Sequence, residues 1–301
     1  MLSRDNPYYQ QVELLIAVLP VIDRYPDFSL KGGTAINLFI QQMPRLSVDI
    51  DLTYVPVNDR KTALAEIAKQ LNAIASEIEK LLSGTKVQCF PEKAKLQVNR
   101  NKVKIKIEVS PVLRGTVLKP KKAKLCQAAQ ETFGYAAMQV HHQDELYAGK
   151  FCAALDRQHP RDLFDVMIFM QTHSITEQLI NVFMVYLLSS NRPIAEMLSP
   201  NLIDIKDTYE KQFSGMTLQK VELKDLEQVR KKLIKAINNQ LSETQKQFLL
   251  LFKQGEPDWQ SFAYPQAKEM PGIQWKLRNI KAMDTKKHQE AVERLKRVLF
   301  G

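Results

Sequence analysis

The stretch Leu30-Lys31-Gly32-Gly33-Thr34, followed by Ser47-Val48-Asp49-Ile50-Asp51-Leu52, decides the fold of this chain. Asp49 and Asp51 are spaced i, i+2, so a strand would place both carboxylates on one face and its apolar residues on the other. Two adjacent like charges are unfavourable without a cation, and Mg²⁺ prefers such oxygen ligands together with phosphate oxygens. The glycine pair would let backbone amides approach those phosphates. The pattern predicts strand, glycine turn, helix and strand around a metal and phosphate site.

Each part of this pattern also has a purely structural interpretation. The glycines could open a helix, with Thr34 as its N-cap, and the two aspartates could form an exposed polar strand face. The combination weakens these alternatives because Asp is depleted in strands.

Glu108 lies on a second predicted strand, Val103–Val109, in which apolar residues alternate with charged ones. It is the one acid on a face otherwise formed by lysines. Sheet pairing could bring Glu108 beside the two aspartates as a third metal ligand. The alternative is a cross-strand ion pair with Lys104 or Lys106.

A third group of charged residues lies between Glu145 and Asp165. Lys150 and Arg157 share a face of one predicted helix, and Asp162 and Asp165 share a face of the next. Lys150 could hold a triphosphate or protonate departing pyrophosphate, and Arg157 or Arg161 could clamp phosphate. The alternative is an internal ion pair between Arg157 and Asp162.

Composition limits the classes of protein and partner. The chain has 301 residues and a net charge of +10, which favours a polyanionic partner such as nucleic acid. Its three cysteines show no metal-ligand or disulfide spacing, no signal peptide is visible, and the apolar runs are too short to span a bilayer. We therefore expect a cytoplasmic protein with no membrane association.

The pattern along the chain predicts an α+β fold in two lobes, residues 1–140 with a mixed sheet and flanking helices, and residues 141–301 mostly helical. The helical lobe is expected to complete the active site. Residues 119–124 read as a basic loop. The predicted helices are 8–22, 34–42, 58–82, 143–158, 161–172, 176–189, 224–253 and 286–300. The predicted strands are 28–31, 48–54, 86–90, 95–99 and 103–109.

In this order the motifs resemble the AbiEii/MenT-type nucleotidyltransferase toxins, within the polymerase-beta-like nucleotidyltransferase superfamily. The matching blocks are 31–38, 45–52, 106–109, 145–157, 161–165 and 271–279, which together extend over nearly the whole chain. Two features differ from the wider superfamily: a threonine follows the glycines where serine is usual, and fourteen residues separate Thr34 from Asp49.

The resemblance implies site residues by position. Asp49, Asp51, Lys150, Asp162 and Asp165 would form the catalytic set, with Mg²⁺ held by Asp49 and Asp51, joined by Glu108. The residues expected to contact the NTP are Gly32, Gly33, Thr34, Arg45, Ser47, Arg157 and Arg161.

The resemblance also implies a function: a bacterial toxin that transfers nucleotides from an NTP to an RNA, in particular the tRNA 3′ end, and so blocks translation. Its partner would be an antitoxin of the winged-helix type. Six lysines could follow RNA phosphates or only solvate the surface: Lys102, Lys104, Lys119, Lys121, Lys122 and Lys124. Two other interpretations stay open, namely transfer to a protein or small molecule, and a non-catalytic RNA-binding module.

Overall fold

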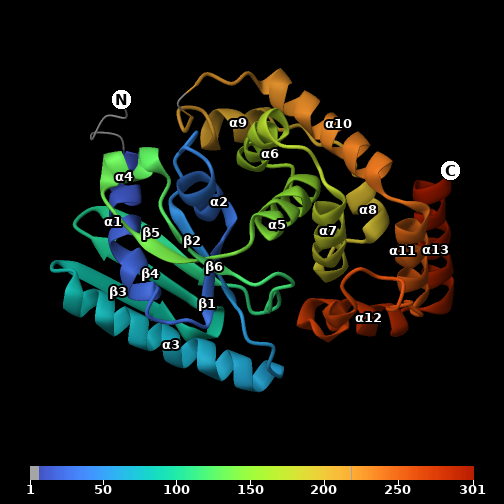
Figure 1. The fold of residues 1–301 in the computed structure, drawn as a ribbon, viewed down its shortest axis with the longest axis horizontal. Helices are drawn as coiled ribbons and strands as arrows, with labels where there is room; N and C mark the ends of the chain where they lie inside the picture. Colours follow the sequence, from blue (N-terminus) through green and yellow to red (C-terminus); the bar gives the residue numbers. More distant parts are fainter. Residues whose placement is uncertain (1–6, 218) are drawn as a thin grey trace. The chain divides into compact units, whose positions relative to one another are not determined.

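The computed structural model describes residues 7–217 and 219–301, which form two compact units. The first unit comprises residues up to Leu146 and the short segment Gly215–Lys220; the second comprises Tyr147–Ser214 and Val221–Gly301. The fold is α+β, with a mixed sheet followed by a mostly helical region, as the sequence predicts (Figure 1).

The first unit is built on a seven-stranded sheet of order β3-β4-β5-β2-β1-β7-β6. In chain order its strands are β1 (Phe28–Lys31), β2 (Asp49–Tyr54), β3 (Thr85–Phe90), β4 (Lys95–Arg100), β5 (Val103–Val109), β6 (Lys121–Lys124) and β7 (Ala137–Val140). The strand β2 is antiparallel to β1 and parallel to β5. The two strands that carry the predicted acids are therefore direct neighbours in the sheet.

The helices of the first unit cover the apolar face of this sheet. Ile50 and Leu52 on β2 and Ile107 on β5 are fully buried, and α1 packs against β5 and α3 (Figure 1). The helical segments are α1 (Pro7–Ile22), α2 (Gly32–Ala35), a π-helix (Ile36–Ile40), α3 (Arg60–Leu81), a 3₁₀ turn (Pro91–Lys93) and α4 (Gln127–Phe133). Since strand residues alternate in direction, Asp49, Asp51 and Glu108 belong to the opposite face.

The second unit is helical, and α5 begins in the first unit and continues into it. Its helices are α5 (Gln143–Asp156), α6 (Pro160–Thr172), α7 (Glu177–Ser189), α8 (Ile194–Leu198), α9 (Lys206–Gln212), α10 (Leu223–Gln240), α11 (Glu243–Gln254), a 3₁₀ segment (Pro265–Glu269), α12 (Pro271–Lys281) and α13 (Thr285–Phe300). Aromatic contacts of Phe151 with Phe169 and Phe183 join α5, α6 and α7.

Three sequence-based predictions of secondary structure are wrong. The helix expected over 224–253 is two helices, because Ser242 forms a capping box with Gln245 and begins α11. The expected basic loop contains β6, which pairs with β7. The helix expected over 34–42 begins earlier, at Gly32, and ends as a π-helix at Ile40.

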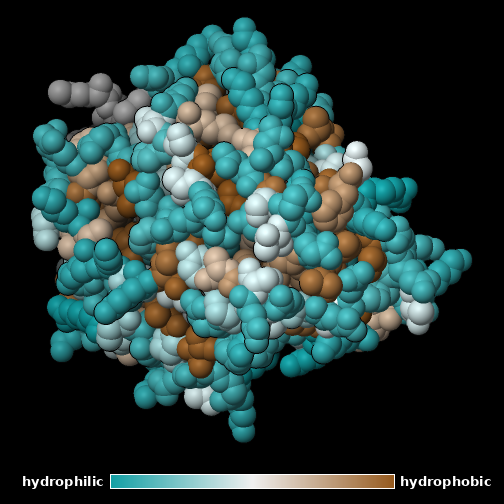
Figure 2. All heavy atoms as spheres, turned by 45° about the vertical axis from the view of Figure 1, so that its right-hand side comes forward, coloured by the Kyte–Doolittle hydropathy of each residue, from teal (hydrophilic) through white to brown (hydrophobic). Residues whose placement is uncertain are grey.

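The surface agrees with the charged composition of the chain. Hydrophilic side chains predominate on the face in Figure 2, with apolar side chains in small groups between them. Within the described ranges, no helix is long and apolar enough to cross a membrane.

Candidate active site

The glycine pair lies where β1 ends and α2 begins, against the side chains of β2 and the segment before it. Gly32 has φ +73°, and a Cβ there would lie 2.6 Å from Asp51 Oδ2. A Cβ on Gly33 would lie 2.7 Å from Arg45 Nη2 and 2.9 Å from Ser47 Oγ. The positive φ of Gly32 favours glycine there, and a side chain at either position would displace these polar groups.

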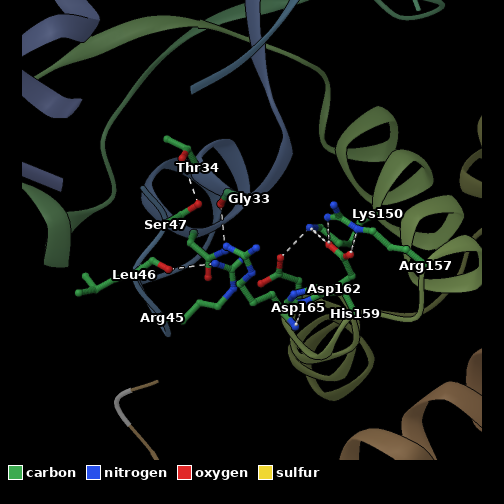
Figure 3. Close-up of polar contacts among 12 residues, drawn as sticks. Gly33, Thr34, Arg45, Leu46, Ser47, Lys150, Arg157, His159, Asp162 and Asp165 are labelled. Carbon is green, nitrogen blue, oxygen red and sulfur yellow. Dashed lines mark hydrogen bonds and ion pairs between the residues drawn. The ribbon is translucent and has the colours of Figure 1, made fainter. Parts of the chain in front are cut away.

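Thr34 fixes the start of β2. Its side chain is buried, and its Oγ1 donates to the main-chain carbonyl of Asp49 at 2.5 Å. The same Oγ1 lies 3.1 Å from Ser47 Oγ (Figure 3). The hydroxyl predicted to contact a nucleotide is thus occupied in holding the first aspartate, while the backbone around it stays a candidate for phosphate contact.

Arg45 is a buried cation held beside Gly33. Its Nη1 donates to the carbonyl of Leu46 at 2.9 Å (Figure 3). Its backbone forms an isolated bridge with Thr217. Asn37 Nδ2 donates to the Gly33 carbonyl at 2.9 Å and so fixes the turn from the other side. The turn therefore presents a guanidinium and backbone amides at one place, which is a suitable environment for phosphate oxygens.

Asp49 and Asp51 are half-buried, and each has a basic neighbour across the sheet. Lys106 Nζ lies 3.5 Å from Asp49 Oδ1, and Lys31 is the register partner of Asp51. Burial lowers the pKa of Lys31, and the Asp51 carboxylate opposes that shift. The Asp49 side chain keeps 34% of its surface exposed, so it is accessible to a ligand.

Glu108 is the register partner of Asp51, as predicted, but its contacts are with lysines. Lys95 Nζ lies 3.0 Å from Glu108 Oε1, and Lys106 Nζ lies 3.9 Å from Oε2. These contacts fit the ion-pair alternative, in which Lys104 or Lys106 was expected: Lys106 is one partner, and Lys95 of β4 is the closer one. Among residues 7–217 and 219–301, no group of three or more His, Cys, Asp or Glu side chains is placed to hold a metal ion.

The six lysines proposed to follow RNA are all exposed. Lys122 forms an ion pair with Asp23 at 2.6 Å, so it is partly neutralised. Lys121 and Lys124 lie on β6, the edge strand, where lysines also discourage pairing with other strands. A structural explanation therefore exists for part of this charge.

In the second unit, Lys150, Asp162 and Asp165 form a buried cluster. Lys150 Nζ lies 2.7 Å from Asp162 Oδ1 and 2.9 Å from Asp165 Oδ2, and all three side chains are at most 6% exposed (Figure 3). The i, i+3 spacing on α6 places both carboxylates beside α5, as the sequence predicts.

Arg157 completes this cluster from the surface. It is 59% exposed, and it donates through Nε to Asp162 Oδ2 at 2.5 Å and through Nη2 to Oδ1 at 3.0 Å. Burial would raise the pKa of Asp162, but Lys150 and Arg157 outweigh burial and hold this pKa well below its usual value. Arg161 lies in the first turn of α6, where its backbone N–H donates to His159 Nδ1 at 3.1 Å. The ion-pair alternative for Arg157 and Asp162 is therefore present.

Sequence reasoning missed a buried acid–base pair in the first unit. His141 Nδ1 lies 3.9 Å from Glu145 Oε2, and Glu145 Oε1 accepts from the backbone N–H of Val117 at 2.9 Å. Burial raises the pKa of Glu145 to about 7, and burial with the nearby Lys31 charge lowers that of His141 to about 3. The i, i+4 spacing of the two residues was the available signal.

The fold is a mixed sheet that carries paired aspartates beside a glycine turn, followed by helices. One solved structure with this fold is MenT4, a nucleotidyltransferase toxin of Mycobacterium tuberculosis H37Rv, with a TM-score of 0.59 and 16% identity over 98% of this chain and 95% of that chain. A tRNA-processing enzyme (apo form I) also matches over 99% of this chain and 98% of that one, at 13% identity, but its TM-score of 0.24 supports no conclusion. No curated protein matches.

A family model described as "Nucleotidyl transferase AbiEii toxin, Type IV TA system" matches residues 13–279. The match extends over most of the chain, so the chain belongs to the AbiEii nucleotidyltransferase toxin family. It is therefore a nucleotidyltransferase toxin of a type IV toxin–antitoxin system, which implies an NTP substrate and an antitoxin.

Proposed function

We propose that this toxin transfers a nucleotide from an NTP to an RNA, with the tRNA 3′ end as acceptor, at the face of the sheet formed by β1, β2 and the glycine turn. The observation that carries the proposal is the contact of Gly32 with Asp51, since it places a carboxylate directly against a backbone that can contact phosphates. The proposed acceptor is a cytoplasmic RNA, and the net charge of +10 supports a polyanionic partner.

Asp49 and Asp51 fit a divalent cation in their chemistry. Both are accessible carboxylates on one strand face, and Mg²⁺ takes a few carboxylate oxygens together with substrate phosphates and water. When bound, Mg²⁺ would neutralise phosphate charge and lower the pKa of an acceptor hydroxyl. Glu108 would act indirectly, because its ion pairs with Lys95 and Lys106 determine the local charge beside Asp51.

The protein's own groups would position the substrate. Backbone amides at Gly32 and Gly33 and the guanidinium of Arg45 would hold the triphosphate, while Thr34 and Ser47 keep the start of β2 in place. The acceptor hydroxyl oxygen would attack the α-phosphorus, the bond from that phosphorus to the bridging oxygen would break, and pyrophosphate would leave. Such in-line displacement depends mainly on positioning and charge stabilisation.

The roles expected for Lys150, Asp162, Asp165, Arg157 and Arg161 stay predictions. The contacts of the first four support a paired cluster, in which Lys150 would exchange a carboxylate for a phosphate in order to act on a nucleotide. The winged-helix nature of the antitoxin is likewise a proposal.

The acceptor is tested by incubating the purified protein with Mg²⁺, each NTP labelled at the α-phosphate, and total tRNA with a protein extract. We expect label that is removed by ribonuclease and resists protease. Label that resists ribonuclease and is removed by protease would replace the RNA acceptor with a protein one.

A further inference from the structure

A hollow of about 270 Å³ lies in the second unit between α8, α11 and α13, and basic residues dominate its charged lining. Lys253, Lys287 and Arg294 line it, against one acid, Glu290. Its remaining wall is apolar: Pro193, Ile194, Ala195, Ala291 and Leu295. None of these residues belongs to the proposed site on the sheet.

Lys253 is the unusual member of this lining. It is a lysine at the end of α11 with only 9% of its surface exposed. Its Nζ has a hydrogen-bond contact at 3.9 Å with Met283 Sδ, which is a weak acceptor. No carboxylate lies within ion-pair distance of this ammonium among the residues that the structure describes, whereas the buried Lys150 has two.

The electrostatics of the surrounding residues agree with an excess of buried positive charge. Burial lowers the pKa of Lys253, with no acidic group to oppose it. Burial also lowers the pKa of Lys276 to about 8, and the Lys253 charge adds to that shift. Lys276 is satisfied by three main-chain carbonyls, those of Leu187, Ser190 and Arg192, at 2.8–3.0 Å. Lys253 has no comparable set of acceptors.

The other charges around the hollow leave it basic. Arg294 Nη1 lies 3.2 Å from Glu196 Oε1, so one of the three lining cations is paired. Lys287 is exposed at the rim, in the first turn of α13. A buried cation without an acidic partner destabilises the folded chain unless an anion compensates it.

We propose that this hollow binds a phosphate group, with Lys253 as the buried anchor and Lys287 and Arg294 at the rim. Several cations around a small hollow suit a ligand with several anionic oxygens. The phosphate could belong to RNA or to a free phosphate compound, and the apolar wall would lie against the sugar or base attached to it. The inference does not depend on nucleotidyl transfer.

The test measures binding of two probes, inorganic pyrophosphate and a single-stranded RNA oligonucleotide, to the full chain by isothermal titration. The titrations are run in EDTA. Any binding at the sheet is the same in both lysine variants and so cancels when the two are compared. Lys253→Met removes the charge at similar volume, and Lys235→Met on α10 is a matched control at an exposed lysine.

We expect Lys253→Met to weaken binding of at least one probe about tenfold or more, while Lys235→Met does not. Weaker binding of pyrophosphate by Lys253→Met identifies a free phosphate compound as the ligand. Weaker binding of RNA alone identifies a phosphodiester. We also expect Lys253→Met to melt at the same or a higher temperature, because it removes a buried charge. The proposal is overturned if the variant binds both probes as the parent does. A lower melting temperature with unchanged binding would show that Lys253 only stabilises the end of α11.

Discussion

The aspartates of the two units share a residue type but differ in environment. Asp49 and Asp51 lie half-buried on a strand face, and the Asp49 carboxylate lies 3.5 Å from Lys106 Nζ. Asp162 and Asp165 are fully buried and contact Lys150 at 2.7 and 2.9 Å. An accessible carboxylate can exchange its neighbour for a ligand, whereas a buried paired one mainly contributes to the fold. The first pair therefore fits a reaction centre, and the second fits a structural support.

The largest expected effect is on turnover, from Asp51→Asn. The substitution removes a charge at the proposed centre and keeps the shape, so transfer should fall about 10³-fold, as for loss of a key electrostatic group. Thermal unfolding should change little, because the carboxylate is half-buried and next to other acids. Transfer assays and melting curves on the same preparations check both parts. Turnover close to that of the wild type would show that Asp51 does not belong to a reaction centre.

Asp162→Asn should have the reverse effect of Asp51→Asn, namely a large loss of stability. It leaves Lys150 and Arg157 with less compensating charge in a buried place, so unfolding free energy should fall by about 3–5 kcal/mol. Asp156→Asn is the matched control, since Asp156 forms an exposed ion pair with Arg192 and should cost about 1 kcal/mol or less. Denaturant unfolding measures both variants. Equal losses would show that burial does not distinguish these carboxylates.

A third buried acid allows a test by pH. Glu145 has a folded-state pKa of about 7 against an ordinary 4.5, so its contribution to stability is present below pH 4.5 and is lost as pH rises to 7. His141, with a pKa of about 3 against 6.5, contributes above pH 6.5 and loses that contribution as pH falls. The two trends oppose each other between pH 4.5 and 6.5.

In Glu145→Gln, only the pH dependence caused by His141 should remain, so the unfolding free energy should fall as pH drops below 6.5. The Glu145 contribution is up to about 3 kcal/mol over its range. Unfolding in denaturant at several pH values measures it. A variant whose pH profile matches the wild type would contradict the burial of an acid–base pair here.

The smallest effect is expected for Gly32→Ala. The new Cβ would meet Asp51 Oδ2 at 2.6 Å, and φ +73° is unfavourable for alanine, so stability should fall by about 1 kcal/mol. Transfer should fall about tenfold because Asp51 moves. Gly84→Ala, also at positive φ but with nothing near its Cβ, is the control that loses stability without loss of transfer. Equal transfer activity of both variants would show that Gly32 is not part of the site.

Much of the sheet could be predicted from the sequence, because β2 and β5 alternate apolar and charged residues. The strand β6 could not, since Lys121–Lys124 has no strand-like composition and is a strand only through its pairing with β7. The break between α10 and α11 had a readable signal in Ser242 and Gln245, but the continuous helical pattern around it dominated the prediction.

The candidate site, like the fold, could be predicted only in part from the sequence. The i, i+2 and i, i+3 spacings indicate which aspartates share a face, because they depend only on local geometry. The closer partner of Glu108 could not be predicted, since Lys95 comes beside it through the register of β4 against β5. The burial of Thr34 was likewise inaccessible, because it depends on how the segment before β2 returns to the glycine turn.

The central claim is that the β2 carboxylates serve nucleotidyl transfer to RNA. The most direct measurement compares two labels on the same NTP, at the α- and the γ-phosphate, with purified protein, Mg²⁺ and total tRNA. We expect α-label on RNA, no γ-label on RNA, and release of labelled pyrophosphate from the γ-labelled NTP. Transfer of γ-label to RNA, or no label on RNA with any NTP, would contradict it.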